Sequence, residues 1–151
     1  MAECYEKAFA FRQEDNAKKG VSVTANMAAQ AKIFNDVGLF DCTLYSGGDM
    51  EWSYRAQKCG YPISYLPTAV VYHPARHNIV QLLKKAKRVA AAKPQNERGV
   101  LRGLIPPLSA WKYILSRYDM SVREKVLAMI VAYIVRVYRS CIAYRVLKEK
   151  V

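Results

Sequence analysis

The sequence lacks several features that would place it in a class directly. Its four cysteines, Cys4, Cys42, Cys59 and Cys141, show neither CxxC pairing nor the spacing of a metal site. No internal repeat, no low-complexity segment and no signal-peptide pattern is found in it. A reducing, cytosolic setting therefore fits best.

Long apolar runs are also missing. A helix that crosses a bilayer needs roughly 18 to 20 apolar residues in a row. The longest such run, 126–135, stops at Arg136. This length suits a buried helix or a helix that lies on a surface.

Acidic residues are scarce in the second half of the chain, whose 151 residues carry a formal net charge of +12. Residues 1–78 hold eight Lys and Arg against eight Asp and Glu, whereas residues 79–151 hold sixteen against four. All of the excess lies in the second half, which predicts an acidic partner for it. The pI of about 9.7 has no aromatic platform or known motif beside it, so no nucleic-acid partner is expected.

Enough apolar residues are present, 52% of the chain, to build the packed core of one ordinary domain. Helices are predicted where helix formers and apolar spacing coincide, at 2–19, 26–37, 50–59, 78–93 and 121–151. Asn26 is expected to cap the second of them, and Ser121 with Glu124 to form a capping box on the last. Gly20, Gly38 and Gly60 are the expected stop signals.

Three short runs favour strands. They are "VSVTA", "YPISYLP" and "TAVVYH", at 21–25, 61–67 and 68–73, and the last is rich in valine, as buried strands are. Prolines and glycines between 93 and 107 indicate a boundary. The prediction is an α/β chain, in which a partial mixed sheet flanked by helices is followed by an all-helical tail.

The stretch "SGGDME" indicates a turn that presents an acid. Gly47 and Gly48 can take backbone conformations closed to other residues, and a helix is predicted to follow. Asp49 would then stand in the first turn, where unpaired N–H groups and the helix dipole favour a carboxylate. From spacing alone Asp49 is either a helix cap or a reactive carboxylate.

The order of these motifs resembles the C-terminal, acceptor-side half of the catalytic domain of family 2 glycosyltransferases, which have the GT-A fold. The resemblance covers about residues 20–90. Its first part is a helix opened by Asn and closed by a VGxFD-like turn, matched by Asn26, Val37, Gly38, Phe40 and Asp41. Its second part is a Gly-Gly-acid stretch with a following Arg and Gly-Tyr pair, matched by Gly47, Gly48, Asp49, Glu51, Arg55, Gly60 and Tyr61. A glycine stands where the acid before the Asp is usual.

The resemblance implies that Asp49 is the general base of an inverting sugar transfer. It also places Glu51, Trp52 and Asn26 among the substrate-binding residues. Glu51 would bind the acceptor or orient a basic neighbour, unless it is only a solvated acid of the first turn. Trp52 would offer a flat face to a sugar, unless it is a core residue.

His73 and Arg76 follow the valine-rich run, in "VVYHPAR". A lone histidine is usually structural, but in many enzymes of this fold a His at this place completes a divalent metal site on the diphosphate. The resemblance therefore implies His73 as a ligand of Mg²⁺ or Mn²⁺, with the remaining ligands outside this chain, and Arg76 near the phosphates. The basic cluster at 84–88 is either a solvated face or a guide for an anionic donor.

The nucleotide-binding half of that family, with its Asp-x-Asp motif, is not found in the sequence, and neither is the QxxRW motif of processive polymerases. We therefore expect three parts: an acceptor-side half-domain over 1–93, a linker with a short helix over 94–120, and an amphipathic basic helix over 121–151. The expected activity is non-processive transfer from a nucleotide-sugar to a saccharide or lipid-linked acceptor, in cell-envelope synthesis.

The basic second half predicts peripheral attachment to an anionic membrane through the last helix, at the cytoplasmic face. The alternative function is a non-catalytic module, which would use this basic segment to bind a membrane surface or a protein partner.

Overall fold

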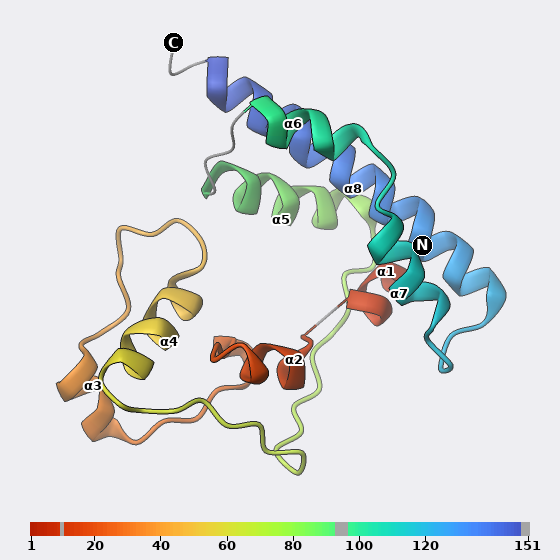
Figure 1. Cartoon of the computed structure of the whole chain (residues 1–151). Helices are drawn as coiled ribbons and strands as arrows, with labels where there is room; N and C mark the ends of the chain where they lie inside the picture. The colour runs from red at the N-terminus through yellow and green to blue at the C-terminus, as the bar shows by residue number, and fades with distance from the viewer. Residues whose placement is uncertain (10, 93–96, 149–151) are drawn as a thin grey trace. The chain divides into compact units, whose positions relative to one another are not determined.

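A computed structural model describes residues 1–9, 11–92 and 97–148, and these are helical wherever they form regular structure (Figure 1). The first four α-helices are α1 (Ala2–Phe9), α2 (Gln13–Lys18), α3 (Ala31–Val37) and α4 (Gly48–Lys58), with a 3₁₀ helix, η1 (Thr24–Asn26), before α3. The remaining four are α5 (Ile79–Ala92), α6 (Glu97–Leu104), α7 (Leu108–Leu115) and α8 (Val122–Lys148).

The predicted mixed sheet is wrong, because the described residues contain no strand. Residues 24–26 form η1, and residues 61–73 run without regular structure. A strand has to exchange backbone hydrogen bonds with a second strand, and the described part of the chain offers none. Val70, Val71 and Tyr72 are accordingly exposed, although their composition is that of a buried strand.

The chain divides into two compact units. Unit 1 is made of Met1–Ala10 and Pro74–Val151, so it joins the start of the chain to its second half. Unit 2 is Phe11–His73. The predicted helix over 2–19 is therefore two helices in different units, separated at Phe11, whose φ of +41° does not continue a helix.

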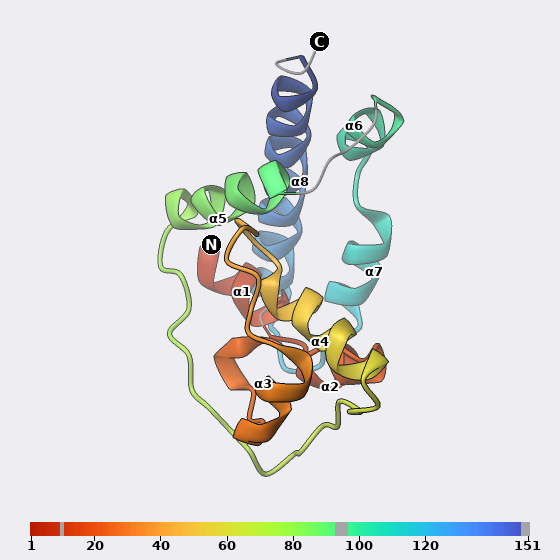
Figure 2. The ribbon, with the colours of Figure 1, turned by 90° about the vertical axis from the view of Figure 1, so that its left-hand side faces the viewer.

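Unit 1 is organised around α8. This helix contacts α1, α5, α6 and α7; Figure 1 shows α6 lying along it, and Figure 2 shows α5 crossing it. One core cluster joins Ala2, Leu82, Ala86, Val131 and Val135. A second lies nearer the start of α8 and joins Ala8, Ile114, Met120, Ala128 and Ala132. Small residues predominate in both clusters, which lets the helices approach closely.

The predicted capping box at the start of α8 is confirmed. The backbone N–H of Ser121 donates to Oε2 of Glu124 (2.7 Å), and the N–H of Glu124 donates to Oγ of Ser121 (3.3 Å). Lys7 of α1 adds an ion pair to the same carboxylate, at 3.0 Å. The cap therefore also ties α1 to α8.

By length and composition, α8 could cross a membrane: it has 27 residues and contains a window of mean hydropathy 1.8. The length of the uninterrupted apolar run, 126–135, did not indicate that α8 could cross a membrane, because Arg136 and Arg139 interrupt the apolar sequence. A buried core helix passes the same test, and 39% of that window is buried within the structure.

Unit 2 has a small core made by α3, α4 and the loop between them. Val37, Trp52 and Ala56 are buried there, with Ile33 and Phe34 packed against them. Gly38 and Gly60 end α3 and α4 with φ of +84° and +86°, as predicted. The predicted cap by Asn26 is wrong, since α3 begins at Ala31 after Gln30.

The cap of α8 predicts a specific dependence of stability on pH. Three hydrogen bonds lower the pKa of Glu124 from 4.5 to about 2. The largest effect comes from the Ser121 N–H, and smaller ones come from Lys7 and the Ser121 hydroxyl. A carboxyl with a lowered pKa stabilises the fold above its unfolded pKa, and this contribution disappears as the pH falls through the folded pKa. Glu124→Gln should therefore unfold more easily at pH 7 and lose less stability than wild type between about pH 5 and pH 2.

Urea denaturation followed by circular dichroism at several pH values checks this expectation. Glu14→Gln, on α2 of the other unit, is the matched control and should keep the wild-type pH dependence. Parallel curves for wild type and Glu124→Gln would contradict the role assigned to the cap.

Candidate functional site

Asp49 stands where the glycine pair turns the chain into α4. Gly47 has φ of +89°, in the left-handed region, and α4 begins at Gly48. The Ser53 hydroxyl donates to the backbone carbonyl of Asp49 (2.7 Å) and accepts from the N–H of Ser22 (3.0 Å). The first turn of α4 is therefore held both by its own helix and by the segment before η1.

The Asp49 carboxylate itself is partly exposed. Its Oδ1 accepts from the N–H of the next residue, Met50, at 2.9 Å. No ion pair to it is formed within the described ranges. A carboxylate of this kind can accept a proton from a bound hydroxyl without first giving up a charged partner.

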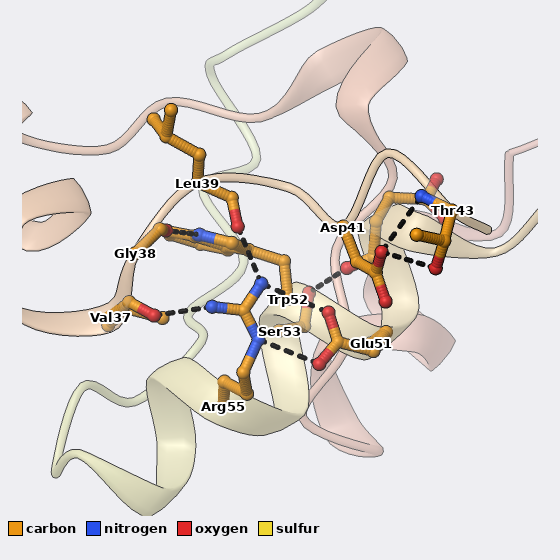
Figure 3. A network of polar contacts seen from close by, with 10 residues as sticks. Val37, Gly38, Leu39, Asp41, Thr43, Glu51, Trp52, Ser53 and Arg55 are labelled. Carbon is orange, nitrogen blue, oxygen red and sulfur yellow. Dashed lines mark hydrogen bonds and ion pairs between the residues drawn. The ribbon is translucent and has the colours of Figure 1, made fainter.

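Arg55 connects α4 to the loop that follows α3 (Figure 3). Its guanidinium donates to Glu51 twice, from Nε at 2.7 Å and from Nη2 at 3.0 Å. It also donates to the carbonyl groups of Val37 and, at 2.7 Å, Leu39. The bidentate pairing of Arg55 with Glu51 is among the stronger hydrogen-bonding arrangements.

This arrangement shows Glu51 orienting a basic neighbour, one of the alternatives weighed for it from sequence. The pairing with Glu51 raises the pKa of Arg55. Arg55 belonged to the recognised motif, but sequence alone gave no reason to connect it with the loop carbonyls. The i, i+4 spacing of Glu51 and Arg55 on a helix was the available signal.

Trp52 is the centre of the unit 2 core and is 2% exposed. Its indole N–H donates to the carbonyl of Gly38 at 2.8 Å, and its ring packs against Phe34 and Phe40, at 4.8 Å and 5.6 Å between centroids. A sugar could stack on this ring only after the neighbouring rings moved. Its predicted contact with substrate stays a prediction.

Asp41 is held in the loop between α3 and α4. Its Oδ1 accepts from the N–H and the hydroxyl of Thr43, at 2.9 Å and 2.6 Å. The bond from the Thr43 hydroxyl lowers the pKa of Asp41 most. The bond from the Thr43 N–H and the charge of Arg55 lower it further. Figure 3 shows Asp41 on the same side of α4 as Glu51.

Asn26 lies at a pocket of unit 2 with a volume of about 250 Å³. Its side-chain amide donates to the carbonyl of Ala69 at 2.9 Å, and so connects η1 to the irregular segment 61–73. Ser22, Ser64 and Tyr65 also line this pocket, whereas Asp49 and His73 are not among its lining residues.

His73 is exposed, and its ring lies 4.8 Å from that of Phe11. Across the described residues, no group of three or more His, Cys, Asp and Glu side chains is gathered as a metal site requires. The residues present therefore do not form a complete site for Mg²⁺ or Mn²⁺ by themselves. The ligand role of His73 stays a prediction that depends on residues from elsewhere.

Arg76 belongs to unit 1, whereas the other candidate residues belong to unit 2. Its Nη1 pairs with Oε2 of Glu6 at 2.7 Å, and the Glu6 side chain is only 5% exposed. A buried carboxylate needs such a partner. In this structure the charge of Arg76 therefore pairs the segment before α5 with α1.

Comparison with known proteins finds one relationship. Over 83 residues, the chain is 36% identical to "Glycosyltransferase AglE" of Haloferax volcanii, a match that covers 55% of this chain and 27% of that protein. Over this part, the chain is related to a glycosyltransferase. Neither family 2 nor the GT-A fold follows from the match. No protein-family model and no solved structure matches the chain.

The core position of Trp52 predicts a large effect on stability. Trp52→Ala should destabilise unit 2 by about 3 to 5 kcal/mol, the usual cost of removing a buried Trp side chain. Trp52→Phe should cost clearly less, because it keeps most of the packing and loses only the bond to Gly38.

Hydrogen exchange of the α4 amides, read by mass spectrometry, measures the effect on unit 2 separately. Tyr54→Ala, at an exposed position of the same helix, is the control and should change little. Equal exchange in Trp52→Ala and wild type would show that Trp52 is not the core residue described.

Proposed function

We propose that this chain forms the acceptor-side part of a glycosyltransferase that moves a sugar from a nucleotide-sugar to a saccharide or lipid-linked acceptor. The observation that carries the proposal is the partly exposed Asp49 carboxylate at the start of an anchored helix, which forms no ion pair among the described residues. The 36% identity to a protein named as a glycosyltransferase supports the reaction class. Because the match covers 27% of that protein, the activity proposed is that of a larger whole.

In the proposed reaction, Asp49 acts as the general base. It takes the proton of an acceptor hydroxyl while the oxygen forms a bond to the anomeric carbon of the donor sugar. The bond from that carbon to the diphosphate oxygen breaks on the opposite face, and the nucleoside diphosphate leaves with the electron pair. One transfer inverts the anomeric centre. Glu51 and Arg55 keep α4 against its loop, so that the carboxylate is held in place.

A divalent metal would neutralise charge on the leaving diphosphate. His73 is the residue of this chain proposed to contribute to it. Since the described residues gather no complete ligand set, no step is derived through the metal.

The role of Asp49 is tested in a complete protein that contains this region. Asp49→Asn should lower kcat by about a hundredfold or more, because a general base commonly contributes this much. The shape of the site should be kept, since Asn replaces one oxygen by nitrogen. The assay is transfer of a labelled sugar from its nucleotide donor.

Asp15→Asn, the same change on α2, is the matched control and should keep wild-type activity. Sugar transfer at the wild-type rate by Asp49→Asn would reject the assigned base. Circular dichroism of both variants separates a catalytic effect from a loss of folding.

A second function, peripheral attachment to an anionic membrane at the cytoplasmic face, is favoured by one surface of α8. Val122, Val126, Ile130 and Ile134 recur at intervals of four residues and are all exposed, although they are apolar. Exposed basic residues flank them, Arg123 at one end and Arg145 with Lys148 at the other. We call these seven residues the α8 outer face.

This pattern of an apolar stripe with basic flanks is typical of a helix that lies in the interface of anionic lipid. Each basic residue near such a surface contributes about 1 kcal/mol. The same attachment would serve transfer to a lipid-linked acceptor, and it would also hold for a module without catalysis.

Vesicle co-sedimentation tests the attachment. Ile130→Asp with Ile134→Asp should lower binding to vesicles of phosphatidylcholine with phosphatidylserine by about tenfold or more, since burying an isoleucine side chain contributes about 1.5 to 3 kcal/mol. Leu39→Asp with Leu44→Asp, at two exposed apolar positions of unit 2, is the control and should bind like wild type. Equal recovery of wild type on neutral and anionic vesicles would reject the attachment.

A further inference from the structure

Unit 1 contains a pocket that is lined by positively charged side chains. Its volume is about 380 Å³, and it is lined by α1, α6, α8 and the residues around the start of α7. Three arginines line it, Arg102 from α6 and Arg136 with Arg139 from α8. Within the described ranges, no carboxylate is among the lining residues and no ion pair neutralises these three side chains.

The guanidinium of Arg136 is only partly satisfied. Its Nη2 donates to the carbonyl of Arg102 at 2.6 Å, which fixes α6 against α8. Its Nε is buried and has no hydrogen-bond partner among the residues that the structure describes. A buried donor without a partner costs about 1 to 3 kcal/mol, so native structures retain few of them. Because Arg136 lines the pocket, an anionic acceptor bound there would add a partner for its guanidinium.

A close helix contact shapes the same pocket. A Cβ atom added to Gly103 would lie 1.6 Å from Oγ of Ser140, so only glycine lets α6 approach α8 this closely. Gly103 and Ser140 both line the pocket. The approach brings Arg102 of α6 beside the two arginines of α8.

A second, smaller pocket of about 170 Å³ extends the positive region. It shares Tyr5, Val135 and Arg139 with the first pocket and adds Lys85 from α5. Burial lowers the pKa of Lys85. The negative charge of Glu6 raises this pKa, and nearby arginines lower it further: Arg76, Arg88 and Arg139. Glu6 is already paired with Arg76. Among the described residues, Glu6 therefore balances only part of the positive charge in this region.

We propose that this arginine pocket, defined by Arg102, Arg136 and Arg139, binds a phosphate group. Arginine matches phosphate in geometry and can donate two parallel bonds to it. The volume is within the range of small-ligand sites. All of the residues lie in unit 1, so the proposal does not depend on the role of Asp49. The phosphate could belong to a soluble molecule or to a lipid headgroup, and the experiments distinguish these sources.

Isothermal titration of the complete chain with inorganic pyrophosphate is the first test. Wild type should bind, and Arg136→Gln with Arg139→Gln should bind at least about tenfold more weakly, because charge-assisted bonds to phosphate are lost. Lys32→Gln with Lys58→Gln removes the same charge from exposed positions of unit 2, outside the arginine pocket and the α8 outer face, and should bind like wild type. No binding by wild type, or an equal loss in both double variants, would overturn the proposal.

A second measurement needs no variant and covers the case in which Arg136→Gln with Arg139→Gln does not fold. Pyrophosphate should raise the thermal midpoint of wild type above its value in sodium chloride of equal ionic strength, because a ligand of the folded state stabilises it. Equal midpoints in the two salts would contradict a phosphate site.

Vesicles of phosphatidylcholine with phosphatidic acid identify the source of the phosphate. If it is a lipid headgroup, pyrophosphate should displace wild type, and Arg136→Gln with Arg139→Gln should be recovered less than the control pair. If it is soluble, recovery should not respond to pyrophosphate while titration still shows binding. Both results support the pocket. Wild type that binds neither pyrophosphate nor these vesicles rejects it.

Discussion

The position of Asp49 depends on one local constraint, which is the attachment of α4 to the carbonyl groups of the loop before it. Trp52 bonds to Gly38 from inside the core, and Arg55 bonds to Val37 and Leu39 from outside. Both side chains come from the part of α4 that follows Asp49, Trp52 one turn and Arg55 about two turns further on. The loop, the helix and the candidate base are therefore one structural element, even though unit 2 has only a small core.

Local signals in the sequence predicted α4, α5 and α8 well, whereas the helix expected over 2–19 is two helices and the one expected from Asn26 begins at Ala31. The glycine pair, the stops at Gly38 and Gly60, and the capping box of Ser121 are all determined by a few neighbouring residues. The sheet could not be predicted in this way, because a strand depends on partners far away in sequence. The valine-rich run at 68–73 has the right composition, but no partner in the described chain.

The candidate site was predictable as a set of residues and less so as a geometry. Asp49, Glu51 and Arg55 lie on one helix, so their spacing gave their relation directly. The burial of Trp52 and the pairing of Arg76 with Glu6 depend on tertiary contacts, which spacing does not reveal. Arg76 and Glu6 are 70 residues apart in sequence.

The structure also shows where residues that carry the excess positive charge lie. In the sequence it is a property of residues 79–151 as a whole. The fold places part of it on the exposed flanks of the α8 outer face and part around the arginine pocket. An exposed basic residue favours an extended anionic surface, whereas a guanidinium in a concave pocket favours a single anionic group. The two surfaces of α8 therefore suit different anionic ligands.

The most direct test of the central claim is a structure of a complete protein containing this region with a bound acceptor. Catalysis by Asp49 predicts that its carboxylate lies about 2.6 to 3.2 Å from the reacting acceptor hydroxyl, or reaches it through one water. An acceptor bound with that hydroxyl on another carboxylate, and with Asp49 turned away from it, would contradict the account.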